Sequence, residues 1–266
     1  MSLLKYGILS TVYEGRPASY KIGGSITMSS NANRILDHLG VYQQVLSTGY
    51  VCGEATISNL KREKIGSFEQ SNVEKYGYPA VVASRSTIRT VLLDECEKQG
   101  ISVKYGMRLL TASENPNTSS TTAQFESGET TTVDFLIGAD GMWSRVREAI
   151  APNIKPEFVG EVAIRGLVDL KNSPGIIDKK AIGMNTKIIV GPAGRFVSSP
   201  LDSECDQVTF HTNITSQSRS KNEWRAFSAD LPGMKAIMQQ FSEEPWPEYV
   251  QKLVTETPPE CFDCWP

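Results

Sequence analysis

One stretch of this chain decides its fold: Phe135-Leu136-Ile137-Gly138-Ala139-Asp140-Gly141-Met142-Trp143-Ser144-Arg145-Val146-Arg147. Its apolar beginning, taken with the preceding residues as Val133–Ile137, predicts a parallel strand covered on both faces, because such strands are nearly continuously apolar. The strand leads into Gly138 and Asp140, and a helix follows that carries Val146 and Ile150. Glycine lets a backbone approach an anionic ligand, and an aspartate at this position is suited to cap the helix. The stretch therefore predicts a turn whose helix start offers N–H groups to a phosphate.

Nearer the N-terminus, a second predicted strand, Ile8–Tyr13, ends at Glu14. In dinucleotide-binding folds an acidic residue at such a strand end hydrogen-bonds the adenosine ribose; an exposed glutamate that only ends a strand is the alternative. The same fold needs a glycine-rich turn roughly 20 residues earlier. Only 13 residues precede Glu14, and Gly7 is the sole glycine among them. Either Glu14 has another role or the chain begins late in the fold.

The remaining patterns predict alternating helices and strands, followed by a region rich in strands. Two polar segments, Lys61–Glu74 and Ser113–Thr122, are expected to be loops. The predicted helices run from Asn31 to Gly40, from Ser84 to Gly100, and in two or three short pieces after Asn222. The predicted strands are Ala55–Leu60, Ile101–Tyr105, Val159–Asp169, Lys187–Val190, Phe196–Ser199 and Gln207–Ile214.

Composition excludes several classes of protein. The net charge of -3 gives no general attraction to nucleic acid or to an anionic membrane. No apolar run approaches the roughly 18–20 residues that span a bilayer, and the N-terminus lacks the pattern of a secretory signal. The five scattered cysteines are an odd number and suit reduced thiols in a cytoplasmic protein better than a disulfide framework.

The stretch from Phe135 to Arg147 closely resembles the Asp-Gly motif of the class A FAD-dependent monooxygenases, the family of p-hydroxybenzoate and salicylate hydroxylases. Three further segments resemble this family: the strand end Thr11–Arg16, the crossing from Gly23-Gly24-Ser25-Ile26 to Gly40, and the helix start Ser84–Ile88. The last is similar to the family's Arg-x-x-Leu, with Ile88 in place of leucine. The resemblance covers nearly the whole chain, but only the Asp-Gly motif is specific.

The resemblance implies a set of FAD-binding residues. They are Glu14, Arg16, Gly24, Arg85, Asp140 and Gly141. In this family the arginine of the helix start reaches toward FAD, and a solvent-facing arginine is the alternative for Arg85. The sequence identifies no catalytic residue.

Two motifs of the family are missing from the chain. The N-terminal Gly-x-Gly-x-x-Gly is absent, and so is the C-terminal Gly-Asp motif that holds the ribityl and pyrophosphate region. The chain stops at Cys261-Phe262-Asp263-Cys264-Trp265-Pro266, about where the family continues toward the second motif. We therefore expect a chain that is truncated at both ends.

The implied fold class is α/β, with an incomplete FAD-binding Rossmann-like βαβ domain interleaved with a sheet-rich substrate domain. Residues 1–50 are expected to form the first part of the FAD-binding domain and 51–84 an insertion of the substrate domain. Residues 85–155 would complete the FAD-binding domain, and 156–266 would form the rest of the substrate domain.

The implied function is that of an FAD- and NAD(P)H-dependent monooxygenase of secondary metabolism. With O2 it would hydroxylate or epoxidise a small aromatic or a polyketide- or terpenoid-like substrate. Two alternatives remain open: a non-catalytic remnant or binding module without FAD, and a flavoprotein dehydrogenase or oxidase. The substrate, the choice between NADH and NADPH and the oligomeric state are not determined by the sequence.

Three other features are weak candidates for function. Cys261 and Cys264 have no second cysteine pair and no nearby histidine, whereas zinc needs about four ligands, so no metal is expected. His38 is expected to face solvent on its helix. His211 lies in an alternating strand, where a base in a substrate cavity and a structural histidine are alternatives; the structural role is favoured.

The missing motif leads to a prediction about the cofactor. We expect this chain to bind FAD weakly, because a phosphate loop normally places several N–H groups on the pyrophosphate. Each such charge-assisted hydrogen bond contributes roughly 1.5–3 kcal/mol, so losing several lowers the affinity by orders of magnitude. Titration of the purified chain with FAD measures this; micromolar or tighter binding would contradict it.

Overall fold

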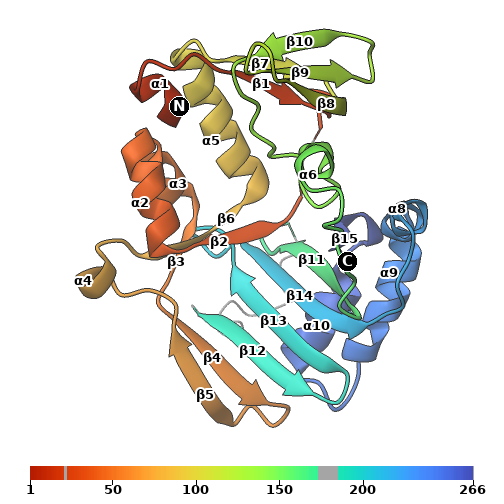
Figure 1. Cartoon of the computed structure of the whole chain (residues 1–266). Helices are drawn as coiled ribbons and strands as arrows, with labels where there is room; N and C mark the ends of the chain where they lie inside the picture. The colour runs from red at the N-terminus through yellow and green to blue at the C-terminus, as the bar shows by residue number, and fades with distance from the viewer. Residues whose placement is uncertain (21–22, 173–184, 266) are drawn as a thin grey trace. The chain divides into compact units, whose positions relative to one another are not determined.

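The computed structural model describes residues 1–20, 23–172 and 185–265 (Figure 1). The described chain forms two compact units, residues 1–21 with 95–159 and residues 22–94 with 160–266. Residues 22–50, expected in the FAD-binding domain, group by contacts with the second unit. The domain boundaries drawn from the sequence at residues 50, 84 and 155 stay predictions.

The first unit contains two small sheets. Strand β1 (Thr11–Glu14) pairs in parallel with β7 (Ser102–Tyr105), so that Glu14 lies opposite Tyr105. Strands β8 (Leu109–Asn115), β9 (Ser120–Phe125) and β10 (Thr130–Val133) form an antiparallel meander. A small core of Met107, Ala123 and Phe125, with Tyr13, Leu109 and Leu136 packed against it, joins the two sheets. Helices α1 (Ser2–Lys5) and α6 (Arg145–Ile150) complete the unit.

The predicted loop Ser113–Thr122 is wrong, because this segment lies in the β8–β9 hairpin. Ser113 pairs with Thr122 and Asn115 with Ser120, and only the four residues between the strands form the turn. The serine and asparagine residues of this segment suggest a turn, but its threonine residues favour a strand. Pairing along the neighbouring strand outweighs the turn preference of the individual residues. The polar composition reflects exposure of the hairpin and not the absence of strands.

The predicted parallel strand Val133–Ile137 is also wrong. Val133 ends β10, which is antiparallel to β9, and residues 134–140 belong to no strand. A strand exists only through hydrogen bonds to a neighbour, and the described residues of this unit provide none beside this segment. Two of its apolar side chains are accordingly exposed, Phe135 by 50% and Ile137 by 64%.

The second unit is built on a mixed seven-stranded sheet in the order β15-β11-β14-β13-β12-β4-β5. Helices α9 (Leu231–Met238) and α10 (Glu248–Glu256) cover one face, as Figure 1 shows, and bury a core that includes Phe196, Phe210 and Leu253. Helix α8 (Lys221–Ala229) precedes them, with a capping box in which Ser220 and Glu223 satisfy each other's backbone N–H groups. The strands are β4 (Glu54–Asn59), β5 (Lys64–Glu69), β11 (Glu161–Asp169), β12 (Thr186–Gly191), β13 (Gly194–Pro200), β14 (Gln207–Thr215) and β15 (Phe262–Trp265).

A three-stranded sheet, β2-β6-β3, packs against the other face of the large sheet. Its strands are β2 (Ser25–Met28), β6 (Ala80–Ser84) and β3 (Tyr50–Cys52). Contact with the large sheet runs through Leu167 on β11 and through Leu201, the residue after β13, which pack with Tyr50 and Val82. Helices α2 (Ser30–Leu39), α3 (Tyr42–Thr48) and α5 (Arg85–Lys98) contribute to a separate core around Val41 and Val45.

Most of the remaining elements agree with the sequence analysis, with one further error. Helix α2 ends as expected at Gly40, whose φ of +83° is the left-handed conformation that glycine favours. The expected polar loop Lys61–Glu74 instead contains β5 and the short helix α4 (Val73–Tyr76). Residues Lys64–Glu69 form a strand because they pair with β4. A bulge in β5, opposite Ile57 of β4, interrupts the alternation that would have revealed this strand in the sequence. The α/β class with several sheets is confirmed.

The outer edge of β1 leads to a prediction about solubility. Within the described residues β1 pairs only with β7, and beside the open edge Leu9 is 87% and Val12 44% exposed. Open apolar edges promote association, so we expect the chain to aggregate and Val12→Lys to increase its monomeric fraction. Light scattering after gel filtration measures this. Thr130→Lys on β10 is the matched control and should change little; a monodisperse, cooperatively melting parent chain would contradict the prediction.

Candidate functional site

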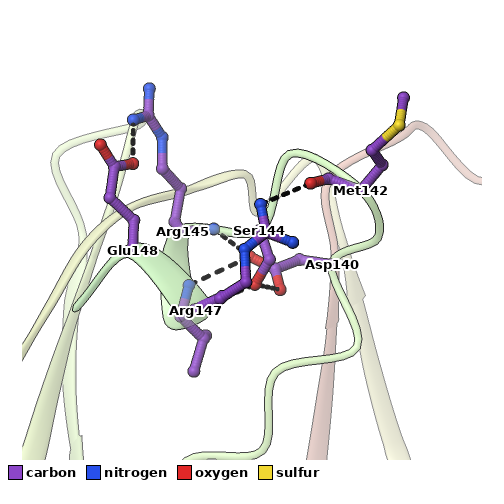
Figure 2. A network of polar contacts seen from close by, with 7 residues as sticks. Asp140, Met142, Ser144, Arg145, Arg147 and Glu148 are labelled. Carbon is purple, nitrogen blue, oxygen red and sulfur yellow. Dashed lines mark hydrogen bonds and ion pairs between the residues drawn. The ribbon is translucent and has the colours of Figure 1, made fainter. Parts of the chain in front are cut away.

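The centre of the candidate site is the turn before α6, where Asp140 organises the backbone (Figure 2). Its carboxylate accepts hydrogen bonds from the Ser144 hydroxyl at 2.5 Å, from the Arg145 N–H at 2.6 Å and from the Val146 N–H at 3.3 Å. Ser144 is itself the N-cap residue and accepts from the Arg147 N–H at 2.9 Å. Asp140 therefore caps the helix as predicted, together with Ser144.

These bonds determine the charge of Asp140. Burial acts to raise the pKa of its carboxyl group, but the hydrogen bonds from Ser144, Arg145 and Val146 favour the ionised form and the net effect is a lowered pKa. Asp140 is thus a carboxylate at neutral pH. Its negative charge also lies at the positive end of the α6 backbone dipole.

The same bonds change what the turn can offer a ligand. The sequence suggests that the helix start presents free N–H groups to phosphate, but the first three are taken by Asp140 and Ser144. The N–H groups of Gly141, Met142 and Trp143 have no acceptor among the described residues. Gly141 has a φ of +79° and open space around its Cα. The donors available to an anion therefore lie in the turn, ahead of the helix.

Two further contacts fix the path of the turn. The chain passes so close to α6 at Gly138 that a Cβ there would lie 2.6 Å from Cβ of Val146. Arg147 reaches back and donates from Nη2 to the carbonyl of Met142 at 2.6 Å. Glycine at the crossing and arginine across the turn hold residues 138–147 in one conformation.

Glu14 and Arg16 lie at the carboxyl end of β1, the end of a parallel strand where nucleotides bind in α/β folds. Oε1 of Glu14 accepts from the backbone N–H of Arg16 at 2.8 Å. The Arg16 guanidinium lies over the Tyr20 ring, 4.1 Å from its centroid. Glu14 is therefore held in place but keeps a carboxylate oxygen without a hydrogen bond to the described residues.

Gly24 and Arg85 are brought together by the three-stranded sheet. The N–H of Arg85 donates to the carbonyl of Gly24 at 2.8 Å, next to the pairing of Ser25 with Ser84. Arg85 is the first residue of α5, whose first turn is capped by the Ser84 hydroxyl through the N–H of Thr87 at 3.0 Å. A cation and a helix N-terminus thus occupy the same place, an arrangement that suits an anionic ligand.

The pair of residues that supports Gly24 is not among those expected from the sequence. Arg165 on β11 is 5% exposed and forms a two-point ion pair with Asp263 on β15, from Nε to Oδ1 at 2.8 Å and from Nη2 to Oδ2. A Cβ on Gly24 would overlap this guanidinium, so the glycine backbone rests directly on it. A single arginine inside the apolar strand Val162–Val168 was the signal, because a buried charge requires a partner.

The predicted cofactor residues belong to different units. Glu14, Arg16, Asp140 and Gly141 lie in the first unit, and Gly24 and Arg85 in the second. Asp140 is adjacent to Gly141, and Gly24 contacts Arg85. No contact between Glu14 and Asp140 is found among the described residues.

The described residues contain no cluster of histidine, cysteine, aspartate and glutamate that could hold a metal. Within the same residues no helix is long and apolar enough to cross a bilayer. The candidate residues in each unit are carboxylates, arginines and backbone donors, groups whose chemistry suits an anionic cofactor.

Comparison with known proteins agrees with this chemistry. Residues 1–236 match the family described as FAD binding domain, and the chain belongs to that family. The Streptomyces platensis enzyme 3-amino-4-hydroxybenzoate 2-monooxygenase PtnB3 is 28% identical over 237 residues, which are 85% of this chain and 55% of that protein. The Aquipseudomonas alcaligenes 3-hydroxybenzoate 6-hydroxylase 1 is 26% identical over 65% of this chain and 45% of its own length.

Solved structures have the same fold. Klebsiella pneumoniae HpxO, crystallised with FAD and uric acid, matches 99% of this chain with a TM-score of 0.79 at 22% identity. The chain covers 63% of that structure. The Arthrobacter nicotinovorans 2,6-dihydroxypyridine-3-hydroxylase matches 98% of this chain with a TM-score of 0.74 at 17% identity. The chain spans about half the length of PtnB3 and of 3-hydroxybenzoate 6-hydroxylase 1. Its resemblance to the class A FAD-dependent monooxygenases is confirmed.

The cap at α6 gives a prediction about stability. Asp140→Ala removes three accepted hydrogen bonds, and loss of a helix cap costs about 0.5–2 kcal/mol. Because the pKa of Asp140 is lowered on folding, this contribution is complete above the ordinary carboxyl pKa and is lost as the pH falls through the lowered value. The difference in free energy of unfolding between parent and variant should therefore be present at pH 7 and shrink below about pH 4.

Denaturant unfolding at several pH values measures this difference. Asp134→Ala is the matched control, since this nearby exposed carboxylate makes no hydrogen bond to the described residues. Equal effects of the two substitutions at pH 7 would rule out the cap.

Proposed function

We propose that the protein is a monooxygenase that uses FAD, NAD(P)H and O2 to insert one oxygen atom into a small aromatic substrate. Two electrons come from NAD(P)H, one oxygen atom enters the substrate, and the other leaves as water. The observation that carries the proposal is the match of residues 1–236 to the FAD binding domain family, with the Asp140 turn at its centre. The two relatives above are named for oxygen insertion into hydroxybenzoates, which favours an aromatic substrate.

FAD would supply the redox chemistry and the activation of oxygen, as cofactors do. The residues of this chain fit an anionic dinucleotide. Glu14 would bind a ribose hydroxyl, because one of its carboxylate oxygens is available to accept from it. The turn at Gly141 has room and donors for a phosphate, and Arg85 with the start of α5 adds positive charge.

Each residue has a distinct role in this proposal. Asp140 acts through the turn, because its bonds to Arg145 and Val146 hold the backbone donors in place. Arg16 fixes the Glu14 carboxylate through its N–H, and Gly24 lets the chain pass over Arg165. None of them is assigned a proton-transfer step.

The alternatives are less well supported. A dehydrogenase or oxidase would share the fold, but the relatives described above are hydroxylases and monooxygenases. Epoxidation of an alkene needs the same cofactor as hydroxylation of a ring. The two reactions are distinguished by which kind of substrate the protein oxidises. The other alternative is a non-catalytic remnant without FAD, and a direct measurement of FAD binding distinguishes it from the proposed monooxygenase.

The proposal predicts graded effects in a version supplied with the glycine-rich strand–turn–helix and the Gly-Asp segment. That version should bind FAD, with bands near 370 and 450 nm, and should oxidise NAD(P)H faster with a cognate substrate. Arg85→Ala should raise the FAD dissociation constant about tenfold or more, since a charged hydrogen bond contributes roughly 1.5–3 kcal/mol. Glu14→Ala should weaken binding while leaving the flavin spectrum unchanged.

Exposed residues provide the controls. Arg225→Ala on α8 and Glu97→Ala on α5 carry the same changes in charge away from the proposed contacts and should leave the dissociation constant unchanged. If Arg85→Ala, Glu14→Ala and Asp140→Ala all match the unsubstituted version, the residue assignments are wrong. If the version binds no FAD, the proposed function fails.

A further inference from the structure

The face of the seven-stranded sheet that α9 and α10 cover carries a row of polar side chains near the β5 edge. We call it the polar row. Its members lie directly opposite one another in the strand register, which runs from β5 through β4 and β12 to β13. They are Ser67, Thr56, Lys187 and Ser198. Lys187 precedes the buried core residue Ile189 by two positions, so the row shares the face of the helix-side core.

The inner end of the polar row is buried beside α10. Ser198 is 1% exposed, and Tyr249, the second residue of α10, is 6% exposed. The Lys187 ammonium lies 5.4 Å from the centroid of the Tyr249 ring. The hydroxyls of Ser198 and Tyr249 are both buried, and neither has a hydrogen-bond partner among the described residues. Because a buried hydroxyl without a partner is costly, two of them beside one ammonium indicate a place for a polar ligand.

The outer end of the site is an exposed cation, Arg62, in the turn between β4 and β5. The turn is fixed by the Arg62 N–H, which donates to the Asn59 carbonyl at 2.9 Å. Two acids of the same hairpin have partners of their own: Glu63 accepts from the Asn59 amide at 2.7 Å, and Glu54 pairs with Lys64 at 3.2 Å. Within the described residues the Arg62 guanidinium has no ion pair or hydrogen bond, so its charge is available to an external anion.

The electrostatics place the two cations and the buried hydroxyls at one position. Burial, and then the charge of Arg62, lower the pKa of Lys187. Burial raises the pKa of Tyr249 to about 12, against the opposing effects of the nearby Ser198 hydroxyl and of Arg62. The Tyr249 hydroxyl is therefore protonated at neutral pH and can donate a hydrogen bond. An anion at this position would offset the repulsion between the two cations, whereas a water molecule would satisfy only the hydroxyls.

The directions of the donors indicate the shape of the anion. Lys187 and Ser198 extend from strands, Tyr249 from a helix and Arg62 from a turn, so the donors come from three kinds of element. An oxyanion with three or four oxygens accepts from several directions at once, and the fork of arginine matches the geometry of phosphate. An ammonium has three N–H donors, so Lys187 can bind such an anion together with another acceptor.

We propose that Arg62, Lys187, Ser198 and Tyr249 form a binding site for a phosphate-like oxyanion. Arg62 and Lys187 supply the positive charge, and the hydroxyls of Ser198 and Tyr249 donate to the oxygens at the buried end. The ligand is either a free oxyanion or the phosphate group of a small metabolite, since both present the same oxygens. A bound oxyanion would connect the β4–β5 hairpin to the start of α10.

This site is separate from the cofactor residues of the same unit. Gly24 rests on Arg165, and the residue before that arginine, Ile164, belongs to the helix-side core. Successive side chains of a strand point to opposite faces, so Arg165 and Gly24 lie on the face away from Lys187. The inference thus goes beyond the proposed monooxygenase function and does not depend on FAD.

The test measures binding of inorganic phosphate to this chain by phosphorus NMR, in a buffer otherwise free of oxyanions. We expect a dissociation constant in the millimolar range or below. Arg62→Met should raise it about tenfold or more, because a charge-assisted hydrogen bond is lost. Tyr249→Phe removes one hydroxyl, keeps the ring and should raise it severalfold. Glycerol 3-phosphate distinguishes the two sources: if it binds at least as tightly, the natural ligand is a phosphorylated metabolite, and if it is excluded, a free oxyanion.

Matched substitutions elsewhere in the second unit are the controls. Arg225→Met on α8 removes an exposed arginine, and Tyr42→Phe on α3 removes the hydroxyl of another buried tyrosine. Both should leave phosphate binding unchanged, and circular dichroism establishes that every variant is folded. The proposal is overturned if the folded chain binds no phosphate at millimolar concentrations, or if either Arg62→Met or Tyr249→Phe binds it as tightly as the parent. Weakening by Arg62→Met alone would mean a counter-ion on an exposed arginine and no built site.

Discussion

The ion pair between the buried Arg165 and the partly exposed Asp263 is the interaction on which the second unit depends. It joins β11 to the edge strand β15 and supports the backbone of Gly24, so it connects the large sheet to the start of β2. A guanidinium that is 5% exposed is costly to bury without a partner, and Asp263 supplies one from a side chain that is itself 42% exposed. The planar fork of arginine is needed, because it satisfies both carboxylate oxygens and leaves a flat surface on which glycine can rest.

The first unit depends on short-range hydrogen bonds in place of a large core. Asp140 and Ser144 satisfy the first N–H groups of α6, and Gly138 lets the chain pass against that helix. The unit buries few apolar side chains, and Phe135 and Ile137 remain exposed. Hydrogen bonds to nearby backbone groups define the turn at residues 138–147. The parallel sheet of the same unit has only the strands β1 and β7.

Two separate kinds of anion recognition emerge from these arrangements. In the first unit, backbone donors at Gly141 and the carboxylate of Glu14 are suited to a dinucleotide. In the second unit, Arg85 lies at the start of α5, and Lys187 lies opposite Ser198 on the helix-covered face of the large sheet. The first unit thus offers N–H groups of a fixed backbone, whereas the second unit offers side chains on a helix and on strands.

The sequence by itself determined the family, the helix cap at Asp140, the ends of α2 and α5, and the strands β11, β13 and β14, because each depends on local chemistry that residue type reveals. Only the tertiary structure decided which segments have a neighbouring strand to pair with. Residues 113–122 became a hairpin because a partner strand was within reach, whereas residues 134–140 have no partner strand among the described residues and form none. It also decided that Arg165 meets Asp263, 98 residues away, and that Lys187 lies between Thr56 and Ser198 in one row. Sheet register brings distant residues together, and no local pattern encodes it.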